Sequence, residues 1–249
     1  RKYIPVPISE VSLDWWVIPK AEVEPFENKN AEKTTEKIET LMVAIHNEVI
    51  SKYQEIIKKT GLESGFIEIE IFSTIRSVFS QEMSSVMIFD MGAASTKLYI
   101  VERGVIKNSH TINRGSQDIT MALSTSLGIS ISEAEEIKRG LNIRRDFEQK
   151  INEIISLNLD FIFSETNQAI FGYQKKYNKN IIKVILTGGG VSLNNFLSFA
   201  RANLQTDVVF GDPFSKVEFP AFLEGILKNS GPEFSVAIGV ALRRLQEAE

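Results

Sequence analysis

The 249-residue chain contains no cysteine and only two histidines, His46 and His110. The lack of cysteine excludes disulfides, thiolate nucleophiles and every zinc or iron–sulfur site built on sulfur. Two histidines cannot supply a three-histidine metal site, and a Ser-His-Asp triad would have to use one of them. The absence of cysteine is also compatible with a cytoplasmic location.

The chain also lacks a surplus of positive charge and a long hydrophobic run. Lys and Arg number 28 against 32 Asp and Glu, a formal net charge of −4. We therefore expect no nucleic-acid binding, which needs a basic face. The longest uncharged run, 184–200, holds three glycines and two asparagines and is short for a bilayer crossing, so we expect no direct membrane insertion. No signal peptide is evident.

Hydrophobic residues make up 43% and charged residues 24% of the chain, which is typical of a globular protein and excludes a disordered one. Apolar runs and turn signals predict an α/β fold with a mixed sheet, in which a meander over 86–110 shares its sheet with 181–186. The predicted strands are 11–18, 38–44, 66–69, 86–90, 97–101, 105–110, 181–186 and 208–210. The predicted helices are 46–60, 71–79, 117–127, 132–139, 145–177, 194–203 and 234–246. A charged loop is expected over 20–37.

A first strand-to-turn junction suggests chemistry. Asp90 ends a buried strand and is followed by small residues up to Thr96. A carboxylate at a strand end can hold a metal-bound water, and small residues let backbone N–H groups approach a phosphate. Ser95 and Thr96 add hydroxyl donors. A plain hairpin with an exposed acid is an equally good interpretation of this segment alone.

A second junction is Thr187-Gly188-Gly189-Gly190, between a buried strand and a predicted helix. Three glycines leave the loop open to an anion or nucleotide, whereas a simple flexible turn needs only one. No Walker loop is present. The charged segment from Ser132 to Lys138 is predicted to begin a helix with a Ser132/Glu135 capping box. Alone, it would be interpreted as a solvated helix face.

In combination these segments resemble the actin-like ATPase superfamily. There, an acid-glycine-threonine hairpin binds phosphate, a triple-glycine strand end contacts adenosine, and an Ala-x-Gly helix, here Ala237-Ile238-Gly239, connects the lobes. Ala134-Glu135-Glu136-Ile137-Lys138 is similar to the helix that presents Glu and Lys to the nucleoside in MreB- and FtsA-type proteins. The resemblance implies an actin-like ATPase (ribonuclease H-like) fold. Because one phosphate hairpin is found where the fold carries two, we expect a complete carboxy-terminal lobe and a partial amino-terminal lobe, with the missing part before Tyr3.

Looser matches narrow the resemblance to PilM-type proteins of type IV pilus assembly. They are Tyr3-Ile4-Pro5-Val6-Pro7, the segment 67–73, Gly115-Ser116-Gln117-Asp118-Ile119-Thr120 and Asp212-Pro213-Phe214. Ser116 replaces a glycine of the family, so we expect a local difference in its backbone. The implied division is a remnant of an extra partner-binding subdomain (1–66), a first connecting segment (67–81), the second actin-like lobe (82–232) and a second connecting helix (233–249).

The same resemblance implies a Mg-ATP site between two lobes. Backbone and hydroxyl groups of Gly92, Ala93, Ser95 and Thr96 would hold the phosphates, and Asp90 would orient Mg²⁺ through water. Gly188, Gly189 and Gly190 would pass beneath the adenosine, while Glu135 and Lys138 would reach the ribose or base. Glu70 is the candidate catalytic residue, although a solvent-exposed glutamate is an equally good interpretation. The implied activity is an ATP-binding switch with slow or no hydrolysis.

The resemblance further implies a cytoplasmic scaffold, peripheral at the inner face of the cytoplasmic membrane. Its expected partner is the amino-terminal cytoplasmic tail of a PilN-like inner-membrane protein, and self-association is compatible with this function. An FtsA-type division filament is the main alternative, and it predicts an amphipathic tail, which residues 243–249 do not form. A sugar or acetate kinase and a scaffold with a degenerate nucleotide site are further alternatives.

Overall fold

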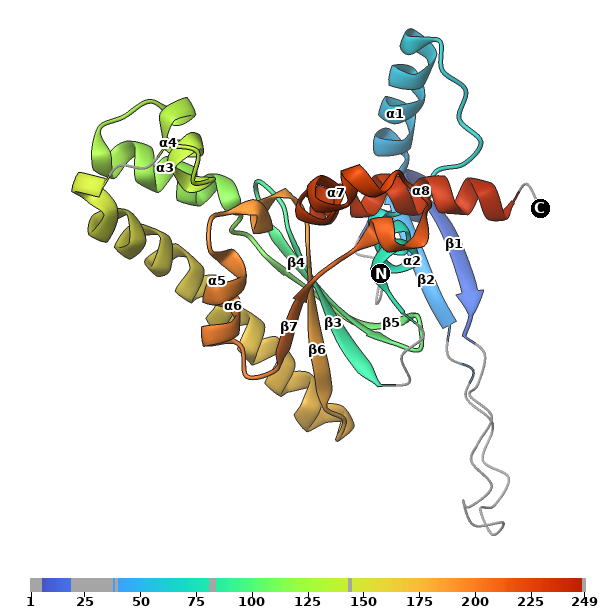
Figure 1. The fold of residues 1–249 in the computed structure, drawn as a ribbon. Coiled ribbons are helices and arrows are strands. Elements are labelled where there is room, and N and C mark those ends of the chain that lie inside the picture. Colours follow the sequence, from blue (N-terminus) through green and yellow to red (C-terminus); the bar gives the residue numbers. More distant parts are fainter. Residues whose placement is uncertain (1–5, 19–37, 39, 81–83, 143–144, 248–249) are drawn as a thin grey trace. The chain divides into compact units, whose positions relative to one another are not determined.

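The computed structural model describes residues 6–18, 38, 40–80, 84–142 and 145–247. The expected charged loop and the Tyr3–Pro5 stretch lie outside the described residues. The chain divides into two compact units, Arg1–Ile67 and Glu68–Glu249, which Figure 1 colours from blue to red along the sequence. Among the described residues, no helix combines the length and the apolar character needed to cross a membrane.

The first unit contains a two-stranded antiparallel ribbon and one helix. Strands β1 (Val11–Val17) and β2 (Thr40–His46) pair with Val11 opposite His46. Helix α1 (Asn47–Thr60) follows and ends at Gly61, whose left-handed backbone (φ 68°) lets its N–H reach the last turn, as the sequence predicted. A short 3₁₀ turn, Ile8–Glu10, precedes β1.

The strand predicted over 66–69 is wrong, because this segment has no regular secondary structure. A strand needs a neighbouring strand to satisfy its backbone groups, and none of the described strands pairs with this segment. Ile69 instead precedes the first turn of α2, and the Glu68 side chain is drawn to Arg76. Apolar alternation over four residues was too short to decide between these outcomes.

The second unit is built on a five-stranded mixed sheet of order β5-β4-β3-β6-β7 (Figure 1). The three strands of the predicted meander are antiparallel, and β6 and β7 continue the sheet in parallel, so the predicted topology is confirmed. The turn between β4 and β5 uses positive φ at Arg103 and Gly104. The strands are β3 (Ser85–Met91), β4 (Thr96–Glu102), β5 (Val105–Ile112), β6 (Ile181–Thr187) and β7 (Asp207–Phe210).

Helices cover both faces of this sheet. Residues Met87, Phe89 and Met91 of β3 belong to the core shared with α3, α5 and α6, whereas Val86 and Ile88 belong to the core shared with α2. The helices are α2 (Glu70–Val78), α3 (Ser116–Leu127), α4 (Ile131–Lys138), α5 (Glu148–Tyr177), α6 (Phe196–Asn203), α7 (Glu224–Ser230) and α8 (Ser235–Gln246). Short 3₁₀ turns cover Arg145–Phe147, Gly189–Ser192, Pro213–Lys216, Ala221–Leu223 and Gly231–Phe234.

Two predicted helix starts need correction. The helix after the glycines begins at Phe196, because the segment Gly189–Ser192 forms a 3₁₀ turn first. Helix α4 is capped by Ser130, whose hydroxyl accepts a hydrogen bond from the Glu133 N–H at 3.2 Å, so the predicted Ser132 cap is wrong. Ser130 and Ser132 both fit the cap pattern, because each is followed three residues later by a glutamate, Glu133 or Glu135.

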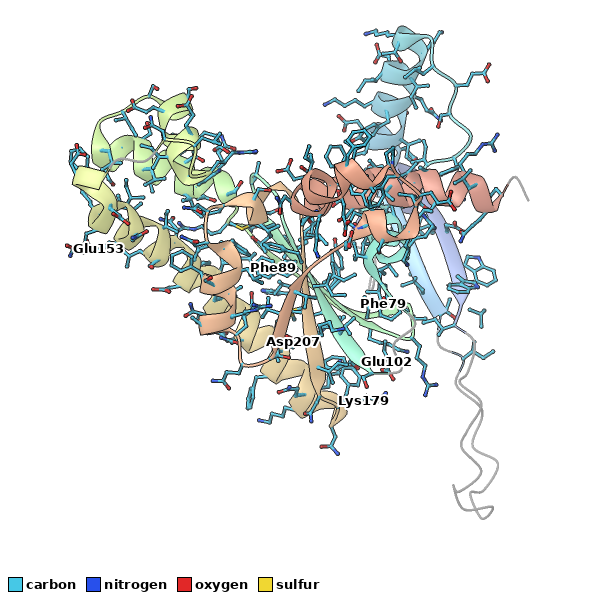
Figure 2. All side chains as sticks on the ribbon, in the orientation of Figure 1. Phe79, Phe89, Glu102, Glu153, Lys179 and Asp207 are labelled. Atoms are coloured by element: carbon cyan, nitrogen blue, oxygen red, sulfur yellow. The ribbon has the colours of Figure 1, made fainter. Side chains whose placement is uncertain are left out.

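The aromatic core and an ion pair mark the two ends of the sheet. Phe89 packs against Phe163 of α5 and Phe196 of α6 with tilted rings, whose centroids lie 6.3 and 5.9 Å away. Figure 2 shows Glu102 and Lys179 close together at the other end of β4, where their side chains form an ion pair of 2.5 Å. Asp90 and Thr96 lie at the opposite end of the paired strands β3 and β4.

A partly buried charge network joins helices α2 and α8. Arg76 on α2 donates to both carboxylate oxygens of Glu68, at 2.9 and 3.1 Å, and to the Gly239 carbonyl of α8 at 2.8 Å. Arg243 on α8 donates to the same carboxylate at 2.8 Å. Burial opposes ionisation, but hydrogen bonds from Arg76, Ser73 and Arg243 lower the pKa of Glu68 to about 2. The ionised Glu68 carboxylate therefore holds α2 and α8 together through charge-assisted hydrogen bonds.

Candidate functional site

The loop between β3 and β4 is tied to the start of α3. The Gly92 N–H donates to the Ser95 carbonyl at 2.9 Å. The N–H groups of Ser116 and Gln117 donate to the carbonyls of Gly92 and Ala93, at 3.0 and 2.9 Å. Within the described part of the chain, the N–H groups of Ala93, Ala94 and Ser95 donate to no protein acceptor, which leaves them available to an anion.

Gly115 makes this close approach possible. A Cβ on Gly115 would collide with the Ala93 carbonyl and would lie 2.7 Å from the Gly92 oxygen. The Asp118 carboxylate accepts the Gly115 N–H at 2.8 Å and so closes the first turn of α3. Ser116 is the first residue of α3, and the non-glycine residues of positive φ in the described chain lie elsewhere. The expected local difference from the family's glycine stays a prediction. A serine fits where the helix has already begun.

Asp90 is a half-buried acid without a partner. In the described residues its carboxylate forms no hydrogen bond or ion pair, and burial raises the pKa of the Asp90 carboxyl above its ordinary value. Its neighbour on β6 is Thr187, in parallel register. An unpartnered carboxylate held partly out of water is costly unless something binds it.

The triple glycine brings the end of β6 against Asp90 and Met91. A Cβ on Gly188 (φ 87°) would collide with the Asp90 carboxylate, and one on Gly190 would lie 2.8 Å from the Met91 carbonyl. A Cβ on Gly189, by contrast, would meet nothing within 4 Å. Two of the glycines thus permit a close approach, while the middle one leaves space open. The expected proximity of Asp90 and the glycine loop at one end of the sheet is confirmed.

Helix α4 carries a connected charge cluster. The carboxylate of Glu135 accepts from Lys138 at 2.6 Å, Thr120 at 2.8 Å and Arg139 at 2.9 Å. Burial acts against ionisation, but these hydrogen bonds lower the pKa of Glu135 to about 2. The Lys138 ammonium is buried and also donates to the Thr120 hydroxyl at 2.9 Å and the Ser116 carbonyl at 3.2 Å. The cluster therefore fastens α4 to α3.

These parts surround one cleft of about 630 Å³, a volume usual for ligand sites. Its walls come from the hairpin loop, the start of α3, the outward face of α4 and the glycine loop. Most of the lining residues have polar or small side chains; they are Ala93, Ser116, Gln117, Thr120, Ile131, Ser132, Glu135, Glu136, Lys138, Arg139, Gly189 and Gly190.

Several predicted site residues meet in this cleft, and others do not. Ala93, Gly189, Gly190, Glu135 and Lys138 line it together, although the Lys138 ammonium is already occupied by protein acceptors. Gly92 and Ser95 close the loop behind Ala93.

Six predicted residues are not among the lining residues: Gly92, Ser95, Asp90, Gly188, Thr96 and Glu70. Asp90 and Gly188 lie against each other at the neighbouring ends of β3 and β6. Thr96 is fully buried and its hydroxyl donates to the Arg114 carbonyl at 2.9 Å, so it holds the hairpin to the chain after β5. Glu70 begins α2 and forms an ion pair with Lys97.

Arg139 and Gln117 were missed from the sequence. Arg139 lies four residues after Glu135, and its guanidinium also lies 3.7 Å from Glu233. Gln117 is the second residue of α3, beside the hairpin loop. The spacing from Glu135 could have indicated Arg139, but nothing local distinguishes Gln117. No group of three or more acidic or histidine side chains gathers as a metal site in the part of the chain that the structure describes.

A mixed sheet with helices on both faces, together with a hairpin loop and a glycine loop that meet at one sheet end, defines the class of actin-like ATPase folds. Solved structures agree: MreB5 of Spiroplasma citri bound to AMPPNP aligns over 82% of this chain and 67% of its own, with a TM-score of 0.58 and 14% identity. The family model for the type IV pilus assembly protein PilM matches residues 1–245, so the chain belongs to that family.

Two further relatives are similar to this chain over most of its length. A structure of a PilM–PilN type IV pilus biogenesis complex covers 97% of this chain and 68% of its own, with a TM-score of 0.79 and 24% identity. The cell division protein FtsA of Neisseria meningitidis serogroup B is 25% identical over 215 residues, covering 77% of this chain and 50% of FtsA. The chain spans about half the length of the curated relatives it matches.

Proposed function

We propose that this chain supplies one wall of an ATP site in an actin-like protein that serves type IV pilus assembly as a nucleotide-dependent scaffold. The observation that carries the proposal is the cleft of about 630 Å³, where the free N–H groups beside Ala93, the open space at Gly189 and the charged face of α4 meet. The phosphates of ATP would bind at the hairpin loop, and its adenine would lie over Gly189 at the other end of this cleft.

Each wall has a distinct task in the proposed site. The backbone N–H groups of residues 93–95 would bind phosphate oxygens, which small side chains leave accessible. Gly189 would lie under the adenosine. Glu135 is anchored by three donors, so its carboxylate and the neighbouring Arg139 present a fixed polar edge to the ribose or base.

The residues present also fit a magnesium ion carried with ATP. Asp90 is a carboxylate without a protein partner, and Mg²⁺ in nucleotide sites is held by one or two carboxylates, phosphates and several waters. The ion would supply charge neutralisation for the phosphates. Asp90 would hold its water ligands, and the missing Cβ of Gly188 keeps that side of the carboxylate clear.

We expect Asp90→Asn in the full-length protein to weaken Mg-ATP binding about thirtyfold, or ~2 kcal/mol, because one charge-assisted contact is lost. The same variant should be more stable than the wild type at pH 7 by about 1 kcal/mol, since Asp90 is desolvated and unpaired. A folded pKa above the unfolded value of 3.8 makes this difference small below pH 3.8 and larger as pH rises through the raised pKa.

Isothermal titration with Mg-ATP and urea unfolding at several pH values measure the two effects. Asp118→Asn is not a suitable control, because the Asp118 carboxylate accepts the Gly115 N–H in the first turn of α3 and the substitution would alter that cap. Asp207→Asn, on an exposed strand end remote from the cleft, is the matched control and should change neither quantity. Unchanged ATP affinity in Asp90→Asn would remove Asp90 from the site.

The proposed scaffold function requires a binding partner. We propose that ATP shifts the population between lobe arrangements with different partner affinity, and that residues 1–66 contribute to a partner-binding subdomain. The partner would be the amino-terminal cytoplasmic tail of a PilN-like protein, which places the complex at the inner face of the cytoplasmic membrane. Family membership and the fold shared with a PilM–PilN complex support this choice.

An immobilised peptide of that tail should retain the full-length protein, and a scrambled peptide should not. Anionic vesicles should bind the protein weakly in a flotation assay, because the proposed membrane contact is made through the partner. Strong vesicle binding without peptide binding would contradict the proposal and favour an FtsA-like function, for which the 25% identity to an FtsA protein is the specific observation.

A further inference from the structure

An ion pair, Lys97 with Glu70, lies at the same end of the sheet as Asp90. Lys97 is the second residue of β4, and its ammonium forms an ion pair with the Glu70 carboxylate, at the first residue of α2. In the register of the hairpin, Lys97 lies directly opposite Asp90. The ion pair therefore joins α2 to the hairpin whose loop would bind phosphate.

Asp90 and Lys97 belong to the same face of the sheet. Residues directly opposite in an antiparallel pair point to the same side, and so do residues two positions apart along a strand. Ile88 and Tyr99, the next pair along, pack in the core with Ile71 and Ile75 of α2. Helix α2 thus lies over this face, and its first residue, Glu70, reaches the end that carries Asp90.

Glu70 has one cationic partner in the described chain, Lys97. The side chains are 40% and 34% exposed, so the pair is a solvent-accessible contact that contributes little to folding. Its loss should leave the fold intact. A carboxylate bound to an ammonium group is nevertheless a poorer proton acceptor and is less free to turn than an unpaired one.

We propose that Lys97 is a positioning residue that restrains Glu70 and so keeps hydrolysis of bound ATP slow. This inference rests on the proposed ATP site. In hydrolysis the water oxygen bonds to the γ-phosphorus, the bond to the bridging oxygen breaks with its electron pair leaving on ADP, and one water proton passes to a base. Glu70 would be that base. The Lys97 ammonium competes with the water proton for the Glu70 carboxylate.

The test uses the full-length protein and compares Lys97→Met, Lys97→Arg, Glu70→Gln and the double variant Glu70→Gln/Lys97→Met. Lys97→Met should raise kcat for Mg-ATP hydrolysis about tenfold while the Kd for ATP, measured by titration under non-turnover conditions, changes less than twofold. Lys97→Arg keeps the ion pair and should retain the slow turnover. The double variant should return to the slow rate, because the released base is gone.

The outcomes separate the two proposals. Wild-type protein that fails to bind ATP contradicts the proposed function and, with it, this inference. Normal ATP binding with unchanged or lower kcat in Lys97→Met overturns only the restraint. A raised kcat that persists in the double variant shows that Glu70 is not the group released, which also overturns it. Circular dichroism and thermal unfolding establish that each variant is folded.

Discussion

Gly189→Val should abolish high-affinity ATP binding while leaving the protein folded. Gly189 lines the cleft, and a Cβ there meets no atom within 4 Å, so the valine side chain fits the protein but fills the space proposed for the adenosine. Gly188 and Gly190 could not be used in this way, because side chains there would collide with Asp90 or Met91. We expect an affinity loss of about a thousandfold, or ~4 kcal/mol.

Titration of Mg-ATP into the wild type and the variant measures this effect, and thermal unfolding without nucleotide checks the fold. Gly225→Val is the matched control, since Gly225 on α7 also has nothing within 4 Å of its missing Cβ and does not line the cleft. It should bind ATP like the wild type. If Gly189→Val binds ATP normally, the nucleotide lies elsewhere and the proposed site is wrong.

Gly239→Ala should be among the most destabilising single substitutions in the second unit. A Cβ on Gly239 of α8 would collide with the Ser73 carbonyl of α2 and would lie 2.7 Å from the Ser73 Cα. Backbone atoms of a helix cannot move aside as a flexible side chain can, so the helices must separate. That separation would also stretch the hydrogen bond from Arg76 to the Gly239 carbonyl. We expect a loss of about 3 kcal/mol or more.

Urea unfolding of the two proteins measures the loss, and the expected signature is a lower midpoint with an unchanged slope. Gly172→Ala on α5 is the control for replacing a helical glycine, because nothing lies within 4 Å of its missing Cβ. It should gain about 0.5–1 kcal/mol from helix propensity. Equal stability of Gly239→Ala and the wild type would show that α2 and α8 do not pack as described.

The parts of the fold that could be predicted are those with a long, regular apolar pattern. Helix α5 repeats buried positions such as Ile151, Ile155 and Leu159 at helical spacing over 30 residues, and β3 is buried almost throughout. The segment 66–69 offered only four alternating residues, no described strand pairs with it, and Glu68 forms an ion pair with Arg76. Short patterns are decided by tertiary contacts that a local pattern does not contain.

The sequence predicted which segments form the candidate site. It did not predict which of their side chains remain available to a ligand. Residue type and order placed Asp90, the hairpin and the glycines at one sheet end, and the register of β3 with β6 brings them together. Which side chains remain available depends on burial. The Lys138 ammonium and the Thr96 hydroxyl are both occupied by backbone carbonyls of distant residues, Ser116 and Arg114, and nothing near them in sequence indicates this.

The attachment of α3 to the hairpin loop has a mechanical consequence. Ser116 and Gln117 grip the loop through two backbone hydrogen bonds, and Lys138 grips the same end of α3 from α4. These hydrogen bonds connect the loop, α3 and α4 into one unit. A displacement of the loop by a bound phosphate would therefore move both helices. Nucleotide states that differ by a small shift at Ala93 would consequently differ by a larger swing at the far ends of α3 and α4.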